Sequence, residues 1–340
     1  MNVAQPASSA SRAGAGGLVL LATVVSALLY YKWGASLRAV SAVHETGKLA
    51  IAPGAILDGG VIATTLAYFR KIWPALTYGI LVGAAIRAAV PASTVRRWFG
   101  GRGPMPTLTG ALAGAPLMLC SCCITPVFSG LYRRGARLGP SLAMMLASPG
   151  FNLGAIILSF ALLPTRIGVA RVVAASAIVL GLSALIGRTL EGSEASGAEA
   201  CATPEAEQLD GSSHFLVRFL RSAAYLVAIT VPLIVAGVLL SGLALPHVTR
   251  LAGASLFVGV AVTALVGTLA ALPTFFEIPI ALVLLSLGAP PAVVTAFVIA
   301  GPIVNLPSLL VLGREAGPRV ALALGGGVWL VSTAAGLLAA

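Results

Sequence analysis

The chain has 340 residues, of which 58% are hydrophobic and only 9% are charged. A soluble domain carries roughly a quarter charged residues, so this chain could not cover a water-facing surface, and we expect an all-α polytopic membrane protein. The formal net charge of +11 does not indicate nucleic-acid binding, because the basic residues are dispersed through short connections between apolar runs, as is usual beside membrane spans.

The N-terminal quarter predicts two leading transmembrane helices. Residues 1–15 are rich in Ser, Ala and Gly and are predicted to be disordered, and residues 16–72 hold apolar runs near Gly17–Tyr31 and Leu49–Tyr68. The first run resembles a signal peptide, but no small-x-small cleavage site closes it, so we interpret it as a retained helix. Asp58 lies within the second run and is a candidate proton-coupling residue.

The remainder of the chain is an internal duplication. Repeat 1 spans 73–188 and repeat 2 spans 215–340, and an acidic hydrophilic linker at 189–214, which contains Cys201, separates them. Each repeat opens with a predicted span, Pro74–Val90 or Ala224–Leu243. Duplication of this kind is typical of transporters with a central site between the copies. Seven matching positions share one register, offset by 153 residues: Pro126/Pro279, Gly135/Gly288, Ala136/Ala289, Ala147/Ala300, Pro149/Pro302, Asn152/Asn305 and Leu153/Leu306.

Each repeat also contains two apolar stretches that are interrupted in the middle. In repeat 1, Met105–Leu131 is broken at Cys120–Pro126, and Ser141–Leu163 is broken at Ser148–Asn152. Proline removes a backbone donor and glycine loosens the helix, and unwound backbone at membrane depth must face protein or a water-filled cavity. The four breaks therefore predict a central polar cavity within about 8–10 transmembrane helices.

The relative orientation of the two repeats is open at this stage. Ten crossings would put both termini on one side and make the repeats parallel. However, the loop Arg133–Arg137 holds three arginines and its counterpart Ser286–Pro291 holds none, which favours opposite sides of the membrane. Re-entrant hairpins at the broken motifs would permit such an inverted arrangement.

Cys120, Cys122 and Cys123 place three soft sulfur donors on a segment that the nearby proline makes non-helical. Thiolates select soft ions such as Cu(I), Zn(II) or trivalent arsenic. Free cysteine also packs as a small hydrophobic residue, which is the alternative. No second cysteine pair and no nearby histidine completes a closed zinc site. We predict that the three thiols bind substrate, including a soft metal.

Glu277 is the acidic residue expected inside the core of repeat 2, where repeat 1 has Ile124. An unpaired carboxylate at membrane depth costs about 2.5–3.5 kcal/mol, so it should be protonated, paired or in a wet cavity. Arg87 is a candidate partner for Glu277 or for Asp58. Proton coupling is the predicted role of Glu277, with snorkelling to the interface as the alternative. Asn152 and Asn305 either cap freed backbone groups or contact substrate.

Three segments, Cys120–Pro126, Arg133–Ala136 and Ser148–Asn152, resemble motifs of the predicted permease family that includes the ArsP organoarsenical efflux proteins. Glu277 to Pro279 and Gly301 to Asn305 in repeat 2 are also similar to it. The resemblance runs from Trp73 to the C-terminus without the linker. It implies an inner-membrane permease that exports trivalent methylated arsenicals through thiols, here on Cys120 and Cys122. This chain departs from the motif with Cys123 where glycine is usual, and neighbouring branches have been linked to copper or zinc.

We therefore expect proton-coupled efflux of a thiol-reactive solute across a bacterial-type inner membrane. Export of copper or zinc, and permeation of a small sulfur compound, remain alternatives. A membrane thiol-disulfide electron carrier is a further alternative, because Cys120 and Cys123 have the spacing of a local redox pair. Such a carrier needs a reactive cysteine in each half, however, and Pro273, Phe275 and Phe276 occupy the matching positions. We expect no enzymatic activity and no resident cofactor. The expected partners are the lipid bilayer and a small thiol-reactive or soft-metal substrate, with a homo-oligomer left open.

Overall fold

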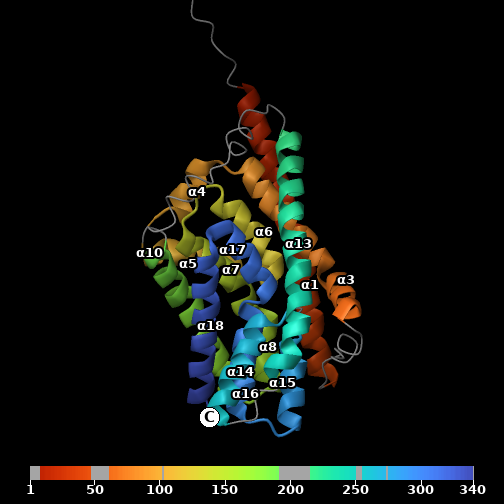
Figure 1. Ribbon diagram of the computed structural model, residues 1–340. Helices are drawn as coiled ribbons and strands as arrows, with labels where there is room; N and C mark the ends of the chain where they lie inside the picture. Colours follow the sequence, from red (N-terminus) through yellow and green to blue (C-terminus); the bar gives the residue numbers. More distant parts are fainter. Residues whose placement is uncertain are drawn as a thin grey trace, which may run out of the picture.

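The computed structural model describes residues 8–46, 61–101, 103–190, 215–249, 255–272 and 275–339 (Figure 1). Within these ranges the regular structure is entirely helical, which confirms the all-α class. Asp58, Cys201 and nearly all of the linker lie outside the described residues.

The two N-terminal helices differ from expectation in their boundaries. Helix α1, Ser8–Thr46, begins within the segment expected to be disordered. Helix α3, Val61–Ala89, is a single helix that contains Pro74. The sequence predicts a boundary between two spans at that proline, and this prediction is wrong. Proline is tolerated inside transmembrane helices because neighbouring helices and local adjustments satisfy the freed backbone groups.

Repeat 1 continues from the C-terminal half of α3 through a short helix, α4, and then through two half-length helices, α5 and α6, that do not cross the molecule. Helix α4, Ala92–Phe99, lies at one end, and α5, Pro104–Gly114, leads through a 3₁₀ turn, Ala115–Leu117, to the tip at Met118–Cys120. Helix α6, Ser121–Tyr132, returns from that tip. The expectation that the proline makes the cysteine segment non-helical is wrong for Cys122 and Cys123, which lie within α6 together with Pro126, while Cys120 is its N-cap.

Close glycine contacts fix the directions of these half-helices. Helix α6 runs parallel to α3, because Gly79 lies against the backbone of Cys123 and Gly83 lies against that of Pro126. Helix α5 runs parallel to α7, Leu138–Gly150, since Gly110 and Gly114 lie against the backbone of Pro140 and Met144. A turn at 133–137 joins α6 to α7, so these two are antiparallel. Consequently α5 and α6 form a re-entrant hairpin.

Repeat 2 has the same order of elements. Helix α13 corresponds to α3, α14 and α15 to the hairpin α5 and α6, α16 and α17 to α7 and α8, and α18 to the helix formed by α9 and α10. In both copies a left-handed glycine ends the hairpin, Gly135 with φ 91° and Gly288 with φ 80°, a conformation that glycine adopts without steric cost. The remaining bounds are α8 Leu153–Leu162, α9 Thr165–Ser176, a π-helical segment Ala177–Leu182, α10 Ser183–Thr189, α13 Phe215–Thr249, α14 Leu256–Leu269, α15 Glu277–Ser286, α16 Pro291–Ile303, α17 Leu306–Ala316 and α18 Pro318–Leu338.

The two repeats are inverted with respect to each other. At one end, Arg133 after α6 forms an ion pair with Glu315 at the end of α17, with Nε and Oε2 2.7 Å apart. At the opposite end, Leu163 between α8 and α9 packs with Ala281 and Val294, on either side of the α15–α16 turn. Each hairpin therefore meets the end of the other repeat's broken helix. This arrangement resolves the orientation that the sequence leaves open.

The described residues contain fewer candidate crossing segments than the 8–10 predicted for the whole chain. Among the described residues, five helices are long and apolar enough to span a membrane. The pairs α7–α8, bent by 41°, and α16–α17, bent by 46°, raise that number to seven. The start of α1 and the C-terminus lie at opposite ends of the molecule (Figure 1). The hairpins fold back instead of crossing, α3 joins parts of two predicted spans into one helix, and residues 47–60 of the predicted second span lie outside the described residues.

Candidate functional site

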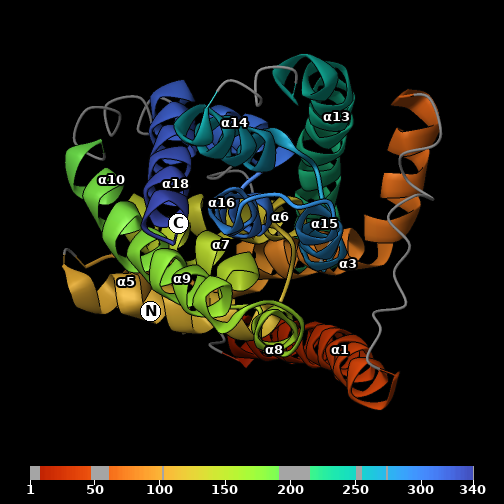
Figure 2. The same cartoon turned by 90° about the horizontal axis from the view of Figure 1, so that it is seen from below.

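The four helix breaks meet in the middle of the molecule. A narrow gap there is lined by residues from all four breaks: Leu119, Cys120, Pro149, Asn152, Leu272, Glu277 and Pro302, together with Ala155. Seen along the long axis of the molecule, α6, α7 and α16 are central and α1 and α3 are peripheral (Figure 2). The structure therefore brings together Cys120, Asn152 and Glu277, which the sequence separates by up to 157 positions.

The three cysteines of repeat 1 form a compact sulfur cluster at the hairpin tip. The Cys120 Sγ lies 2.8 Å from the Cys123 Sγ and 3.3 Å from the Cys122 Sγ, and the last two sulfurs are 3.9 Å apart. The Tyr68 hydroxyl lies 3.0 Å from the Cys122 Sγ. Cys122 and Cys123 are fully buried, whereas Cys120 is 6% exposed. The cluster is therefore approached through Cys120.

This spacing suits a soft ion or atom held by two or three thiolates. A bond of about 2.3 Å from a central atom to each sulfur puts two sulfurs about 3.3–4.0 Å apart for bond angles between 90° and 120°. Two of the three observed separations fall in that range, and the third would have to widen. Among the described residues this is the one group of three or more metal-ligating side chains.

Polar contacts hold the hairpin tip in place. The Leu119 amide donates to the Ser148 hydroxyl at 2.8 Å, and that hydroxyl lies 3.3 Å from the Leu119 carbonyl, to which it donates. Met118 has a left-handed backbone with φ 48°, which is strained for a residue with a side chain. The Ser148 contact therefore fixes an unfavourable turn that presents Cys120 at the start of α6.

A cavity of about 240 Å³ opens beside Cys120. It is lined by parts of α1 and α3, by Asn152 at the N-cap of α8, and by Met118 and Phe275, which both have positive φ angles. Of the three thiols, only that of Cys120 belongs to the lining. The lining residues are Tyr31, Lys32, Ala35, Ser36, Ala39, Lys71, Ile72, Ala75, Met118, Cys120, Asn152 and Phe275.

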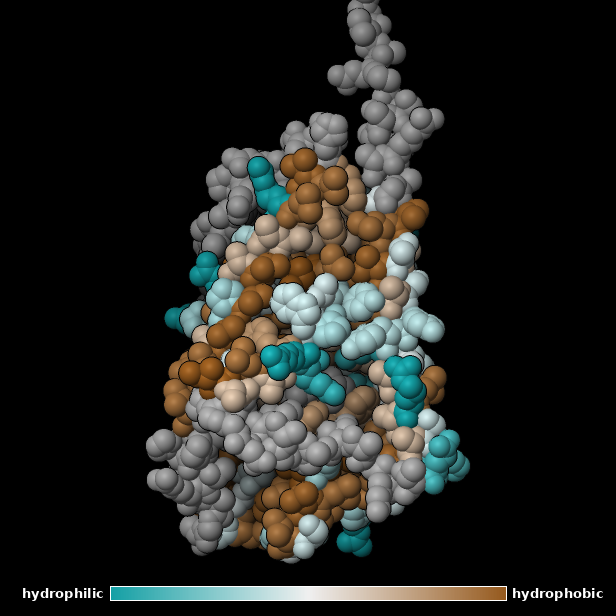
Figure 3. Space-filling view, turned by 90° about the vertical axis from the view of Figure 1, so that its right-hand side faces the viewer, coloured by the Kyte–Doolittle hydropathy of each residue, from teal (hydrophilic) through white to brown (hydrophobic). Residues whose placement is uncertain are grey.

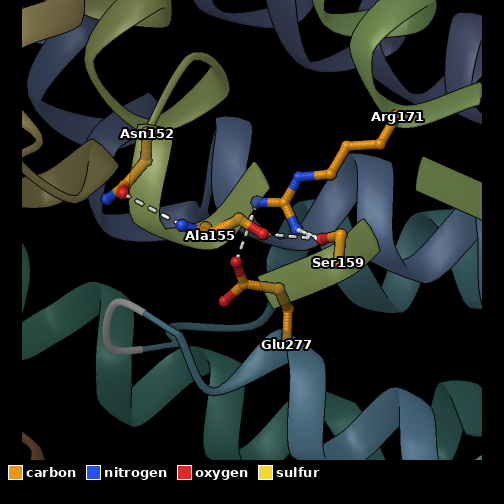
Figure 4. A network of polar contacts seen from close by, with 5 residues as sticks. All are labelled: Asn152, Ala155, Ser159, Arg171 and Glu277. Atoms are coloured by element: carbon orange, nitrogen blue, oxygen red, sulfur yellow. Dashed lines mark hydrogen bonds and ion pairs between the residues drawn. The ribbon is translucent and has the colours of Figure 1, made fainter. Parts of the chain in front are cut away.

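Glu277 forms a buried ion pair with Arg171 (Figure 4). The Arg171 Nη2 donates to the Glu277 Oε1 at 2.9 Å, and Nη1 donates to the Ser159 hydroxyl at 3.0 Å. Both charged residues are only 2% exposed. Pairing of this kind removes the cost of an isolated charge at membrane depth.

Arg171 is the site residue that sequence reasoning missed, because it was grouped with the loop cations. Arg166 lies at the start of α9, whereas Arg171 lies in the apolar run that follows. That position could have identified Arg171 as a buried charge. Arg87 does not pair with Glu277, and Asp58, the other predicted partner of Arg87, lies outside the described residues. The Arg87 guanidinium instead lies over the Tyr225 ring, 4.5 Å from its centroid.

Both asparagines cap the helices that follow the breaks. The Asn152 Oδ1 accepts from the Ala155 amide at 3.3 Å, and the Asn305 Oδ1 accepts from the Ser308 amide at 2.9 Å. The backbone N–H of Asn305 in turn donates to the Ser308 hydroxyl at 3.0 Å. Asn152 also lines the cavity and the gap. Within the described part of the chain, the buried Asn305 Nδ2 has no hydrogen-bond partner.

Asn305→Ala is expected to lower the stability of the protein by about 1 kcal/mol, because it removes the cap of α17. Asn305→Ser should restore most of that loss, since serine is also a good cap. Thermal unfolding of the purified variants in detergent measures both effects. Equal losses in the two variants would contradict a stabilising role for the cap.

Residues 59–340 match the ArsP_1 family model, described as a predicted permease. The UPF0718 protein YraQ of Escherichia coli K12 is 30% identical over 323 residues, covering 91% of this chain and 90% of the relative. The UPF0718 protein MJ0584 of Methanocaldococcus jannaschii is 24% identical over 334 residues, covering 78% and 90%. No solved structure matches the chain significantly. The chain thus belongs to the ArsP_1 family of predicted permeases and is a multi-pass membrane protein.

Proposed function

We propose that this permease exports a small thiol-reactive solute, such as a trivalent methylated arsenical, by binding it at the hairpin tip of repeat 1. The observation that carries the proposal is the cluster of three sulfurs at a helix break, with Cys120 lining a cavity. A thiol group in the middle of an inverted-repeat carrier is where alternating access would expose a substrate to each side in turn.

The binding chemistry requires no oxidant. In a methylarsenical with two arsenic-bound hydroxyl groups, each As–S bond forms as one thiol proton leaves with one hydroxide as water. Cys120 reacts first because it lines the cavity. Cys122 or Cys123 then supplies the second sulfur, since both lie within 3.3 Å of the Cys120 Sγ. Water reverses the same steps when the solute is released.

The ion pair of Glu277 and Arg171 supports a proton-coupling role. Glu277 lines the gap that Cys120 also lines, so a proton reaching the carboxylate from that gap would weaken its bond to Arg171. Because Arg171 lies on α9 and Glu277 begins α15, this change would loosen a contact between the two repeats. Asp58 stays a candidate from the sequence alone.

The thiol proposal is tested by transport of methylarsenite into proteoliposomes. Cys120→Ser is expected to reduce the initial rate at least tenfold, and Cys122→Ser and Cys123→Ser to reduce it several-fold, because sulfur binds soft atoms far better than oxygen does. Cys201→Ser in the linker is the matched control and should retain the wild-type rate. Wild-type protein that moves Cu(I) but no arsenical would favour the soft-metal alternative. Transport unaffected by Cys120→Ser would refute the thiol site.

The proton step is tested separately with the double variant Arg171→Gln/Glu277→Gln, which leaves no lone buried charge. We expect it to carry methylarsenite down its gradient but to lose acceleration by an imposed pH gradient, which wild type should show as a several-fold higher rate. A double variant that still responds to the pH gradient would exclude this pair as the coupling site.

A further inference from the structure

The cavity beside Cys120 is electropositive. Lys32 and Lys71 both line it, and no acidic side chain among the described residues does so. Lys32 lies in the middle of α1 and is 9% exposed, whereas Lys71 on α3 is exposed. Neither lysine has a hydrogen bond or an ion pair within the described ranges.

The burial of Lys32 is not explained by the fold. A lysine in the middle of a transmembrane helix costs about 2.5–3.5 kcal/mol unless it is compensated. Arg171, the other buried cation of this region, is compensated by Glu277. Glu277 does not also neutralise Lys32, because Glu277 lines the adjoining gap and not the larger cavity. The Lys32 ammonium group is therefore available for a ligand.

The surrounding backbone reinforces the positive potential. Cys120 and Asn152 are the N-cap residues of α6 and α8, and both line the cavity. The N-terminal end of a helix carries a partial positive charge and unpaired amide groups, which favour anions. The Oδ1 of Asn152 faces the Ala155 amide in the cap and its nitrogen points away from that bond (Figure 4), so its amide group adds a donor at the same place.

The outer surface beside α3 is consistent with a polar entrance to the cavity at mid-height of the molecule. On the side of the molecule where α3 lies in Figure 1, hydrophilic side chains gather at mid-height between hydrophobic zones (Figure 3). A purely lipid-facing surface would be apolar at this height. The cavity between α1 and α3 lies in the same part of the fold.

We propose that the transported solute is an anion: its carboxylate, sulfonate or similar group binds between Lys32 and Lys71 while its soft, thiol-reactive atom meets Cys120. This inference rests on the proposed function and narrows its substrate class. The volume of about 240 Å³ is below the range of roughly 300–1,000 Å³ for drug-sized ligands, so the anion is small.

The charge of the cavity is measured without any transported substrate. The purified protein is treated with the anionic sulfonatoethyl or the cationic trimethylammonioethyl methanethiosulfonate, and peptide mass spectrometry follows the mixed disulfide at Cys120. Relative to a small free thiol, the anionic reagent should react at Cys120 at least tenfold faster than the cationic one. Lys32→Gln should reduce this ratio several-fold, whereas Arg38→Gln, an exposed change on the same helix, should leave it within twofold.

Substrate preference is measured with two arsenicals that differ by one group, phenylarsine oxide and its 4-carboxy derivative. Wild type should bind the carboxylate compound at least tenfold more tightly, and Lys32→Gln should remove that preference while binding the neutral compound within about twofold of wild type. Equal affinity for both compounds in wild type, or equal weakening of both by Lys32→Gln, would overturn the anion inference and leave the thiol site standing. Failure of wild type to bind either compound would overturn both proposals.

Discussion

Arg171→Gln alone and Glu277→Gln alone are each expected to lower the apparent Tm of the detergent-solubilised protein by roughly 5–15 °C. Each change leaves the other charge buried without its partner, and the loss of one member of a buried ion pair costs about 3–5 kcal/mol. Both residues are 2% exposed, so solvent cannot replace the missing charge. Thermal unfolding followed by size-exclusion chromatography measures the shift.

The double variant Arg171→Gln/Glu277→Gln should unfold at a higher temperature than at least one of the single variants, because no lone charge remains. Arg166→Gln, an exposed change at the start of the same helix, is the control. It should shift stability by less than about 0.5 kcal/mol. Strictly additive losses in the double variant would contradict a direct interaction between the two charges.

Gly79→Ala is expected to prevent α3 from packing against the cysteine hairpin and to abolish most folded protein. A β-carbon at Gly79 would lie 2.1 Å from the Cys123 carbonyl oxygen, and one at Gly83 would lie 2.3 Å from that of Pro126. Backbone atoms cannot move aside as a flexible side chain can. Small residues four positions apart are what allow two membrane helices to approach this closely.

The same substitution at an open position provides the comparison. A β-carbon at Gly326 on α18 meets nothing within 4 Å, so Gly326→Ala should be neutral or stabilising by up to about 1 kcal/mol. The yield of monodisperse protein from membranes distinguishes the two variants. Normal yield of Gly79→Ala, with the fully buried Cys122 and Cys123 still shielded from alkylation as in wild type, would contradict the close packing described here.

The sequence was sufficient to predict the all-α class, the duplication and, to within a few residues, the places where the helices break; the first break lies at Met118–Cys120, and Pro126 is inside α6. Each of these follows from local chemistry: apolar runs, proline and glycine, and a shared register from Pro126 and Pro279 onwards. The orientation of the copies was not predictable, because a half-length apolar helix that crosses and one that turns back have the same composition. The contacts of Gly79 and Gly110 with backbone are what determine it.

The site was predicted only in part, for a related reason. Cys120, Asn152 and Glu277 were singled out from their residue types at the breaks, and the structure brings them around one gap. The partner of Glu277 depends on which helix passes it in space, so nearness in the chain gave no guide to Arg171. The roles of these residues in binding remain predictions that the proposed experiments test.

The ion pair between Arg133 and Glu315 has a consequence for the energetics of the carrier. A carrier with inverted repeats reaches its opposite-facing state when the two copies exchange conformations. In the shared register the counterparts of Arg133 and Glu315 are Ser286 and Leu162, which cannot form an ion pair at the other end. The two conformations of such a carrier would therefore differ in free energy. In an exchange of this kind, the ion pair would stabilise the conformation described here, and no equivalent pair would stabilise the opposite one.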